Sequence, residues 1–218
     1  MEKYIDHTAL KAVTTKIEID KLIDEAKTYT FKSVCVNPSW VEYCVEKLKN
    51  SGILVCTVIG FPLGANTKEV KAFETSQAVK NGALEIDMVI NIGKAKEADF
   101  EAVYQDILAV REVSKGITLK VILETCYLTD DEIKECSKLA LKAKADFIKT
   151  STGFGTNGAT TEHIKMMKEI AGDKMEVKAS GGIRSKEDML KMLSAGATRI
   201  GTSNSVDIIK GTKSSNDY

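Results

Sequence analysis

The segment FIKTSTGFG, residues 147–155, decides how the rest of the chain is interpreted. Phe147, Ile148 and the Thr/Ser residues that follow are typical of a short buried strand, which ends at a glycine-rich turn. Lys149 stands in the middle of this strand. A lysine is almost never fully buried without a reason. The segment therefore predicts a functional amine near the end of a buried strand.

Seven further apolar or β-branched runs flank this one along the chain. Together they give eight expected strands, at residues 4–8, 33–37, 54–60, 85–90, 119–124, 147–152, 176–181 and 199–203. Segments with the apolar spacing of helices lie between them, and five of these segments have a candidate N-cap, at Thr15, Asn66, Thr129, Thr160 and Ser185. Strand then helix, repeated about eight times, predicts an α/β fold, a single-domain (β/α)8 TIM barrel. A doubly wound open sheet is the alternative.

The composition fits one globular domain without an internal linker. The 218 residues are 43% apolar, and 31 basic against 31 acidic residues give a net charge of zero, so no global field attracts nucleic acid or an anionic membrane. The first residues lack the pattern of a signal peptide, and every apolar run is short of membrane-spanning length. We expect a cytoplasmic protein with a barrel at residues 1–210 and a polar C-terminal tail at 211–218.

The cysteines and histidines give no pattern of a metal or disulfide site. Five cysteines occur without a CxxC pair, and the two histidines are far apart in the chain. We therefore expect reduced cysteines and a reaction that needs neither a metal nor another cofactor.

Alternation along the expected strands separates an apolar face from a charged one. In EVKASG (176–181), for example, Val177 and Ala179 share one side, and Lys178 lies on the other. In a barrel the second face is the interior, and side chains near the strand ends lie at the C-terminal mouth, where active sites of barrels are found. The charged residues expected to converge there are Asp6, Asp87, Lys120, Glu124, Lys149 and Lys178. A purely structural ion-pair network is the alternative, although burying so many charges is costly.

Two lysines on adjacent strands suggest amine chemistry. An ordinary lysine, with a pKa of about 10.4, is protonated at neutral pH and is not a nucleophile. Two ammonium groups about 5 Å apart repel each other by roughly 3 kcal/mol, which favours a neutral form for one of Lys149 and Lys178. A neutral amine can form a Schiff base with a carbonyl substrate, and Asp87 is the expected acid/base group.

Two glycine-containing turns predict a phosphate site. SGGIRSKED (180–188) and GTSNSVDII (201–209) each join a strand end to a helix start, after the expected seventh and eighth strands. Backbone N–H groups at such turns, with the helix dipole, bind phosphate, and these loops are a frequent phosphate site in barrels. A phosphorylated carbonyl compound fits both the lysines and the turns.

The motifs of the chain resemble those of the deoxyribose-phosphate aldolase family, nearly from end to end. The matching segments are IDHTAL (5–10), VCVNPSWV (34–41), VIGFPLGA (58–65), EIDMVINIG (85–93), KVILET (120–125), FIKTSTGFG (147–155), VKASGGIR (177–184) and RIGTSNS (199–205). The resemblance implies a (β/α)8 barrel and a class I aldolase, a lyase. Such enzymes reversibly cleave 2-deoxy-D-ribose 5-phosphate to D-glyceraldehyde 3-phosphate and acetaldehyde in deoxyribonucleotide catabolism and carbohydrate degradation.

The resemblance also assigns roles to residues. It implies that Lys149 forms the Schiff base, that Lys178 lowers the pKa of Lys149 and exchanges protons, and that Asp87 transfers protons through water. Asp6 and Thr152 would support this network. The residues expected around the substrate and its phosphate are Gly153, Gly181, Gly182, Gly201, Ser203, Asn204 and Cys35.

Two positions qualify this assignment. Some relatives have a phosphate-binding lysine directly after STG, where this chain has Phe154. A terminal tyrosine reaches the active site in some relatives, and here Tyr218 ends the chain. The family also suggests a homodimer or homotetramer. The functional alternatives are another phosphosugar lyase or isomerase on the same barrel, and a phosphosugar-binding protein without catalysis.

Overall fold

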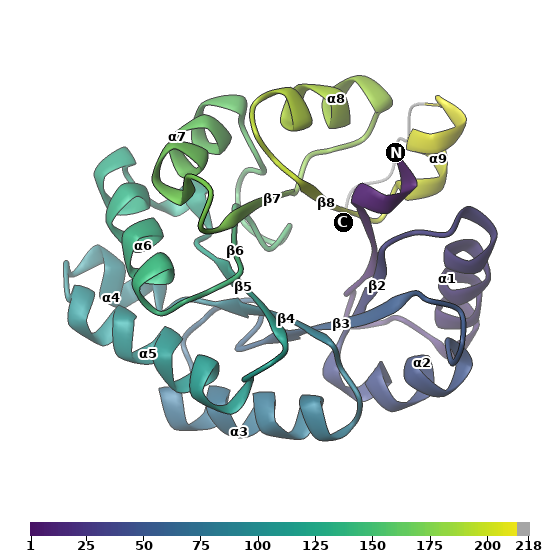
Figure 1. The fold of residues 1–218 in the computed structure, drawn as a ribbon, viewed down its shortest axis with the longest axis horizontal. Helices are drawn as coiled ribbons and strands as arrows, with labels where there is room; N and C mark the ends of the chain where they lie inside the picture. Colours follow the sequence, from purple (N-terminus) through teal and green to yellow (C-terminus); the bar gives the residue numbers. More distant parts are fainter. Residues whose placement is uncertain (213–218) are drawn as a thin grey trace.

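The computed structural model describes residues 1–212, and in this range eight parallel strands close into a barrel (Figure 1). Each strand pairs with its neighbours in the sequence, and β1 pairs with β8 to close the ring. The strands are β1 (Ile5–Ala9), β2 (Ser33–Val36), β3 (Leu54–Ile59), β4 (Glu85–Val89), β5 (Thr118–Ile122), β6 (Phe147–Lys149), β7 (Glu176–Ser180) and β8 (Arg199–Thr202).

Helices form a ring around the strands (Figure 1). They are α1 (Lys16–Tyr29), α2 (Val41–Lys47), α3 (Lys68–Lys80), α4 (Ile92–Lys96), α5 (Phe100–Val113), α6 (Asp130–Lys142), α7 (Thr161–Ala171), α8 (Lys186–Ser194) and α9 (Ser205–Lys210). Three short 3₁₀ helices, η1 (Glu2–Tyr4), η2 (Pro38–Trp40) and η3 (Thr125–Tyr127), complete the described elements. No helix within residues 1–212 combines the length and apolarity needed to cross a membrane.

The predicted single-domain (β/α)8 barrel is therefore confirmed, and the open sheet is excluded by the pairing of β1 with β8. The N-caps at Thr15, Thr129, Thr160 and Ser185 are confirmed, since each side chain accepts a hydrogen bond from a backbone N–H of the first turn. The prediction for α3 is wrong by one residue, because Thr67, not Asn66, accepts from the N–H of Val70.

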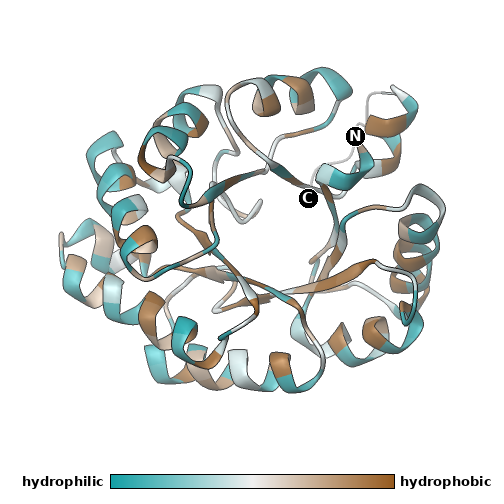
Figure 2. Cartoon of the chain, in the orientation of Figure 1, coloured by the Kyte–Doolittle hydropathy of each residue, from teal (hydrophilic) through white to brown (hydrophobic). Residues whose placement is uncertain are grey.

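The main core lies between the strands and the helices. Ile148 of β6 and Val177 of β7 are fully buried, in one apolar cluster with Ile164 and Met167 of α7. Figure 2 shows the apolar colour running along the strands, while the hydrophilic colour lies largely on the helices. A separate, smaller cluster contains Leu10, Cys35, Cys56 and Val58. The alternation predicted from the sequence thus gives the strands one face for the helices and another for the barrel interior.

A buried ion pair ties α3 and α5 to the end of β4. Lys71 Nζ lies 2.6 Å from Asp106 Oδ2 and donates to the carbonyl of Val89 at 2.8 Å. The same carboxylate oxygen accepts from the N–H of Asn91 at 3.0 Å. Because both charged groups are satisfied where β4 ends, this pair stabilises the strand that carries Asp87.

A close backbone contact requires glycine at position 64. Gly64 has φ +67°, and a Cβ there would lie 1.9 Å from the carbonyl oxygen of Ile90. Gly52 has a similar φ of +74°, but a Cβ at that position would have no neighbouring atom within 4 Å. We expect Gly52→Ala to lower the free energy of unfolding by about 1–2 kcal/mol, the cost of a left-handed backbone. Gly64→Ala must lower it by clearly more, because the backbone must also move.

Urea denaturation of the two variants measures this difference. Equal losses of stability for Gly52→Ala and Gly64→Ala would show that the close approach of the segment around Gly64 to the end of β4 is not a constraint on the fold.

Candidate active site

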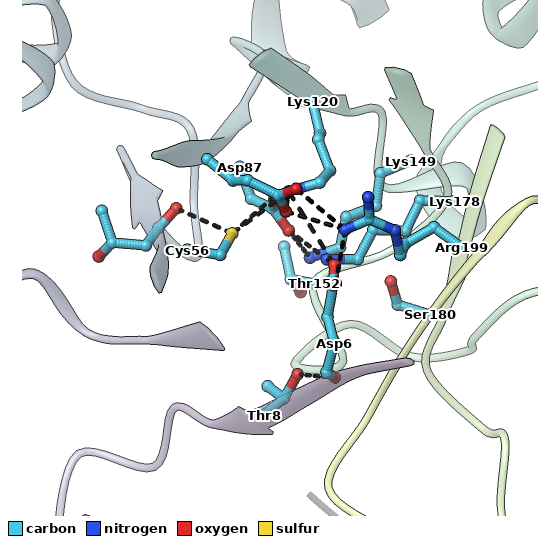
Figure 3. Close-up of polar contacts among 12 residues, drawn as sticks. Asp6, Thr8, Cys56, Asp87, Lys120, Lys149, Thr152, Lys178, Ser180 and Arg199 are labelled. Atoms are coloured by element: carbon cyan, nitrogen blue, oxygen red, sulfur yellow. Dashed lines mark hydrogen bonds and ion pairs between the residues drawn. The ribbon is translucent and has the colours of Figure 1, made fainter. Parts of the chain in front are cut away.

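Strand register brings five of the six predicted charged side chains together inside the barrel. The sixth, Glu124, lies after the end of β5 and contacts Thr152 instead. Asp87 of β4 is paired with Lys120 of β5, and Lys149 of β6 is paired with Lys178 of β7. All four residues are at most 3% exposed. In Figure 3 they converge from different strands on one group of contacts, together with Asp6 of β1.

Asp87 is the centre of this group. Its Oδ2 accepts from Lys149 Nζ at 2.8 Å and from Lys178 Nζ at 2.8 Å. Its Oδ1 accepts from Lys120 Nζ at 2.8 Å and from the Cys56 thiol at 3.1 Å. Lys149 Nζ and Lys178 Nζ each lie 2.8 Å from the same oxygen, Asp87 Oδ2, so the two nitrogens are no further apart than twice 2.8 Å.

Asp6 and Glu85 form a second, deeper group. Asp6 Oδ2 accepts from Lys178 Nζ at 2.5 Å, and Asp6 Oδ1 accepts from Ser33 at 2.7 Å and from Arg199 at 2.7 Å. Arg199 also contacts Glu85, with Nη1 2.9 Å from Oε2. The carboxylate of Asp6 thus contacts Lys178 and is itself held by Ser33 and Arg199.

Opposite charges keep these groups ionised despite their burial. Burial favours the neutral acid for Asp87, but Lys120, Lys149 and Lys178 outweigh it and hold the pKa of Asp87 well below its ordinary value. In the same way Lys178, Lys120 and Arg199 overcome burial and lower the pKa of Asp6. Burial acts to lower the pKa of Lys178, yet Asp6 and Asp87 raise it above the ordinary lysine value. The amine of Lys178 is thus protonated at neutral pH.

Lys149 differs from the other cations of the cluster in its number of partners. Lys178 pairs with two carboxylates, Lys120 with three and Arg199 with two, whereas Lys149 pairs only with Asp87 among the described residues. Four cations face three carboxylates in this network, so one positive charge is in excess. Lys149 is the cation of this network that is held by the fewest ion pairs.

Thr152 lies next to this network but contacts a different acid. Its hydroxyl donates to Glu124 Oε2, and its backbone N–H donates to Glu124 Oε1 at 3.2 Å. Burial raises the pKa of Glu124, although the hydrogen bonds from Thr152 oppose this shift. Glu124 has a left-handed backbone (φ +57°), shortly after the end of β5. Because the carboxylate that Thr152 holds belongs to this loop and not to the Asp87 group, its support would act through the loop.

The glycine-rich turns line a cavity of about 290 Å³ at the C-terminal ends of β6, β7 and β8. Five of the six residues expected there line it: Gly153, Gly181, Gly182, Gly201 and Asn204. Ser203 does not, although its neighbours Thr202 and Asn204 do. The cavity also includes Arg184, which the SGGIR motif contained but sequence reasoning did not assign.

Cys35 lies in the barrel interior, where its register partner on β3 is Cys56. A hydrogen bond with Cys56 lowers the pKa of the Cys35 thiol, against the effect of burial. The two thiols and Asp87 are within 4.8 Å of one another, the distance range of a metal site. The residues do not fit a divalent cation well, because Asp87 already accepts from three ammonium groups that would repel it.

Sequence reasoning missed Glu85 and Arg199 as members of the charged network. Both are buried, at 1% and 6% exposure, and both lie at the first position of their strands. Strand parity was the available signal, because Glu85 shares its face with Asp87. The signal for Arg199 was weaker, since a cation at a strand start is commonly exposed.

Comparison with known proteins gives the family. A model for "DeoC/LacD family aldolase" matches residues 1–212. The deoxyribose-phosphate aldolase of Staphylococcus haemolyticus (strain JCSC1435) is 59% identical over 216 residues, which are 99% of this chain and 98% of that protein. Deoxyribose-phosphate aldolase 1 of Staphylococcus aureus (strain MW2) is 59% identical over 217 residues, or 100% and 99% of the two chains.

Solved structures agree with the sequence matches. QR15, an aldolase, superposes with a TM-score of 0.91 at 40% identity, over 96% of this chain and 94% of that one. The tetrameric deoxyribose phosphate aldolase from Aeropyrum pernix superposes with a TM-score of 0.90 at 33% identity, over 96% and 89%. The matches thus identify an aldolase, a lyase. The chain belongs to the DeoC/LacD family of aldolases.

The depressed pKa values of Asp6 and Asp87 predict acid sensitivity. Both carboxylates return to a pKa of about 3.9 on unfolding, so they contribute stability above that pH, which is lost as the pH falls through their lower folded values. The free energy of unfolding should fall between about pH 5 and pH 2.5. The free energy of unfolding of Asp6→Asn should be about 3 kcal/mol lower than that of the wild type at pH 7, because Lys178 and Arg199 lose a charged partner. On acidification this variant should lose less of its remaining stability than the wild type does.

Denaturant unfolding at several pH values tests this, with Asp24→Asn on the exposed surface of α1 as the control. If Asp6→Asn has the same dependence on pH as the wild type, Asp6 does not carry the pH-dependent stability assigned to it.

Proposed function

We propose that this aldolase reversibly cleaves 2-deoxy-D-ribose 5-phosphate to D-glyceraldehyde 3-phosphate and acetaldehyde, through a Schiff base on Lys149, in deoxyribonucleotide catabolism. The observation that carries the proposal is the contact of Lys149 Nζ with Asp87 Oδ2 at 2.8 Å, beside the charged Lys178. Relatives named deoxyribose-phosphate aldolase, 59% identical along the whole chain, support the choice of substrate.

The first step is formation of the imine. The neutral amine of Lys149 attacks the aldehyde carbon, C1, of the open-chain sugar, and loss of water gives a protonated imine. Lys178 stays protonated between Asp6 and Asp87, so its charge opposes a second ammonium group at Lys149. Lys178 can also give a proton to the departing oxygen and recover it later.

The second step breaks the bond between C2 and C3. Its electron pair moves into the C1–C2 bond to give an enamine, while C3 becomes the aldehyde of glyceraldehyde 3-phosphate. The proton of the C3 hydroxyl passes to Asp87, through water, and C2 of the enamine is then protonated. Hydrolysis of the imine releases acetaldehyde and returns Lys149 to its free form. Asp6 supports these transfers by holding Lys178 in place.

The phosphate would bind at the glycine-lined cavity. Gly153, Gly181, Gly182 and Gly201 present backbone at its wall, and Ser203 and Asn204 belong to the loop after β8. Phe154 replaces the lysine of some relatives and packs edge-on against Phe61, with ring centroids 5.3 Å apart. Backbone amides, together with Arg184 in the cavity wall, would therefore supply most of the phosphate affinity.

Thr152 and Cys35 keep smaller predicted roles. Thr152 would position the loop after β6 through its contact with Glu124, and Cys35 would line the interior near the substrate.

Other predictions remain proposals. Within the described residues the last element ends at Lys210, which fits a catalytic unit of residues 1–210 followed by a polar tail. Tyr218, which matches the terminal tyrosine that reaches the active site in some relatives, lies outside the described residues. Assembly as a homodimer or homotetramer is supported by the tetrameric relative from Aeropyrum pernix. A cytoplasmic location is supported by the five free cysteines.

Lys149→Leu tests the proposal directly. It should lower kcat/KM for cleavage of 2-deoxyribose 5-phosphate by at least about 1,000-fold, because, despite burial, the carboxylates around Lys120 and Lys178 raise the pKa values of these lysines and keep their amines protonated. Lys165→Leu, at an exposed position of α7, is the matched control and should keep wild-type activity. Coupling of the released glyceraldehyde 3-phosphate to a dehydrogenase measures the rate. Normal turnover by a folded Lys149→Leu variant would disprove the mechanism.

Lys178→Leu should change the pH dependence as well as the rate. Without the neighbouring positive charge, Lys149 holds its proton more strongly, so the rising limb of kcat/KM against pH should move to higher pH. A reduced rate with the rising limb in its original place would mean that Lys178 acts only in proton transfer or structure.

A further inference from the structure

Two buried serine hydroxyls, those of Ser151 and Ser180, take no part in the proposed steps of the reaction. Ser151 and Ser180 are 0% and 1% exposed, and neither Oγ has a hydrogen-bond partner among the residues described. Buried hydroxyls are nearly always paired, because an unpaired one costs about 1–3 kcal/mol. In Figure 3, Ser180 lies near Lys178 without a contact of its own.

Their positions relate them to the two lysines. Ser180 follows Lys178 by two residues in β7, so both lie on the same side of that strand, about 7 Å apart along it. Ser151 follows Lys149 by two residues, just beyond the C-terminal end of β6. The register pairs Lys149 with Lys178. Beyond that pair, Thr150, which precedes Ser151, bonds the N–H and the carbonyl of Ser180 through its hydroxyl, so the two segments stay in contact. The two hydroxyl-bearing residues are thus neighbours in the layer directly above the amines.

Glycines keep this layer open. A Cβ at Gly201, the register partner of Ser180, would lie 3.0 Å from Ser180 Oγ and 3.0 Å from Lys178 Cε. A Cβ at Gly181 would lie 3.4 Å from the Cβ of Ser151. Both glycines also line the cavity assigned to the phosphate. The serines therefore stand between the amines and that cavity.

Hydrogen bonds to the nearby backbone do not satisfy the hydroxyls of the two serines. The N–H and carbonyl of Ser180 are already paired with the hydroxyl of Thr150, at 3.1 Å each. Ser137, a buried serine of α6, by contrast donates to the carbonyl of Ile133 at 2.7 Å, as helical serines commonly do. Lys149 is itself only 3% exposed, so a substrate that reaches its amine must enter the layer where the serines lie.

We propose that Ser151 and Ser180 bind the C4 hydroxyl of the sugar, which is the hydroxyl of the glyceraldehyde 3-phosphate half. This inference rests on the proposed function. With C1 on Lys149 and the phosphate among the glycines, C4 lies between the two ends. Ser151 and Ser180 are then specificity-determining residues, which favour acceptor aldehydes with a hydroxyl next to the carbonyl. They take no part in imine formation.

Two reactions of the same enzyme separate these roles. Exchange of the methyl protons of acetaldehyde with D2O, followed by NMR, needs the imine and enamine but no sugar hydroxyl. Cleavage of 2-deoxyribose 5-phosphate needs the imine and enamine and also recognition of the sugar hydroxyl. In Ser151→Ala and Ser180→Ala, exchange should stay within about twofold of the wild type, while kcat/KM for cleavage falls about tenfold for each variant.

A substrate analogue and a control variant complete the test. With 2,4-dideoxyribose 5-phosphate, which lacks the C4 hydroxyl, wild type and variants should cleave at the same rate. Ser137→Ala should leave the ratio of cleavage to exchange unchanged. The two site variants should also be no less stable than the wild type, because the unliganded protein loses no hydrogen bond.

Three outcomes would overturn the inference: unchanged cleavage of 2-deoxyribose 5-phosphate in both variants, equal losses of cleavage and exchange, or equal losses with the 4-deoxy analogue. Absence of both reactions in the wild type would instead contradict the proposed function, so the two failures can be told apart.

Discussion

Pairing of buried charges around Asp87 is the interaction on which the site depends. One carboxylate accepts from Lys120, Lys149 and Lys178, each at 2.8 Å, inside a barrel where water has little access. An isolated charge would be very costly there, so every charged side chain of the interior must find a partner. This requirement positions all three amines, and it leaves Lys149 with a single carboxylate while the others have two or more.

Closure of the barrel makes that pairing possible. Asp6 belongs to β1 and Asp87 to β4, yet both touch Lys178 of β7. Asp6 can reach Lys178 and Arg199 because β1 is paired with β8. The fold and the chemistry are therefore linked: the closed ring brings the acids to the lysines, and the ion pairs tie β1, β4, β5, β6, β7 and β8 together from the inside.

Much of this arrangement could be predicted from the sequence, because strand alternation is a local property. It placed Asp6, Asp87, Lys120, Lys149 and Lys178 on one face, and the barrel made those faces meet. The position of each residue along the barrel axis, by contrast, cannot be predicted from the local sequence. Glu85 and Arg199 were missed since their partners are set by the stagger of the strands, and the unpaired hydroxyls of Ser151 and Ser180 are visible only once all neighbours are placed. The cap of α3 was misplaced because Asn66 and Thr67 are both good caps, and only the backbone selects between them.

The most direct test of the central claim is to locate the imine. Wild-type protein is incubated with acetaldehyde, reduced with borohydride, digested and analysed by peptide mass spectrometry. If Lys149 is the nucleophile, a two-carbon adduct will be found on the peptide that contains Lys149, while Lys120 and Lys178 stay unmodified. An adduct on Lys178 in place of Lys149, or no adduct on any buried lysine of an active preparation, would contradict the assignment of roles within the charged cluster.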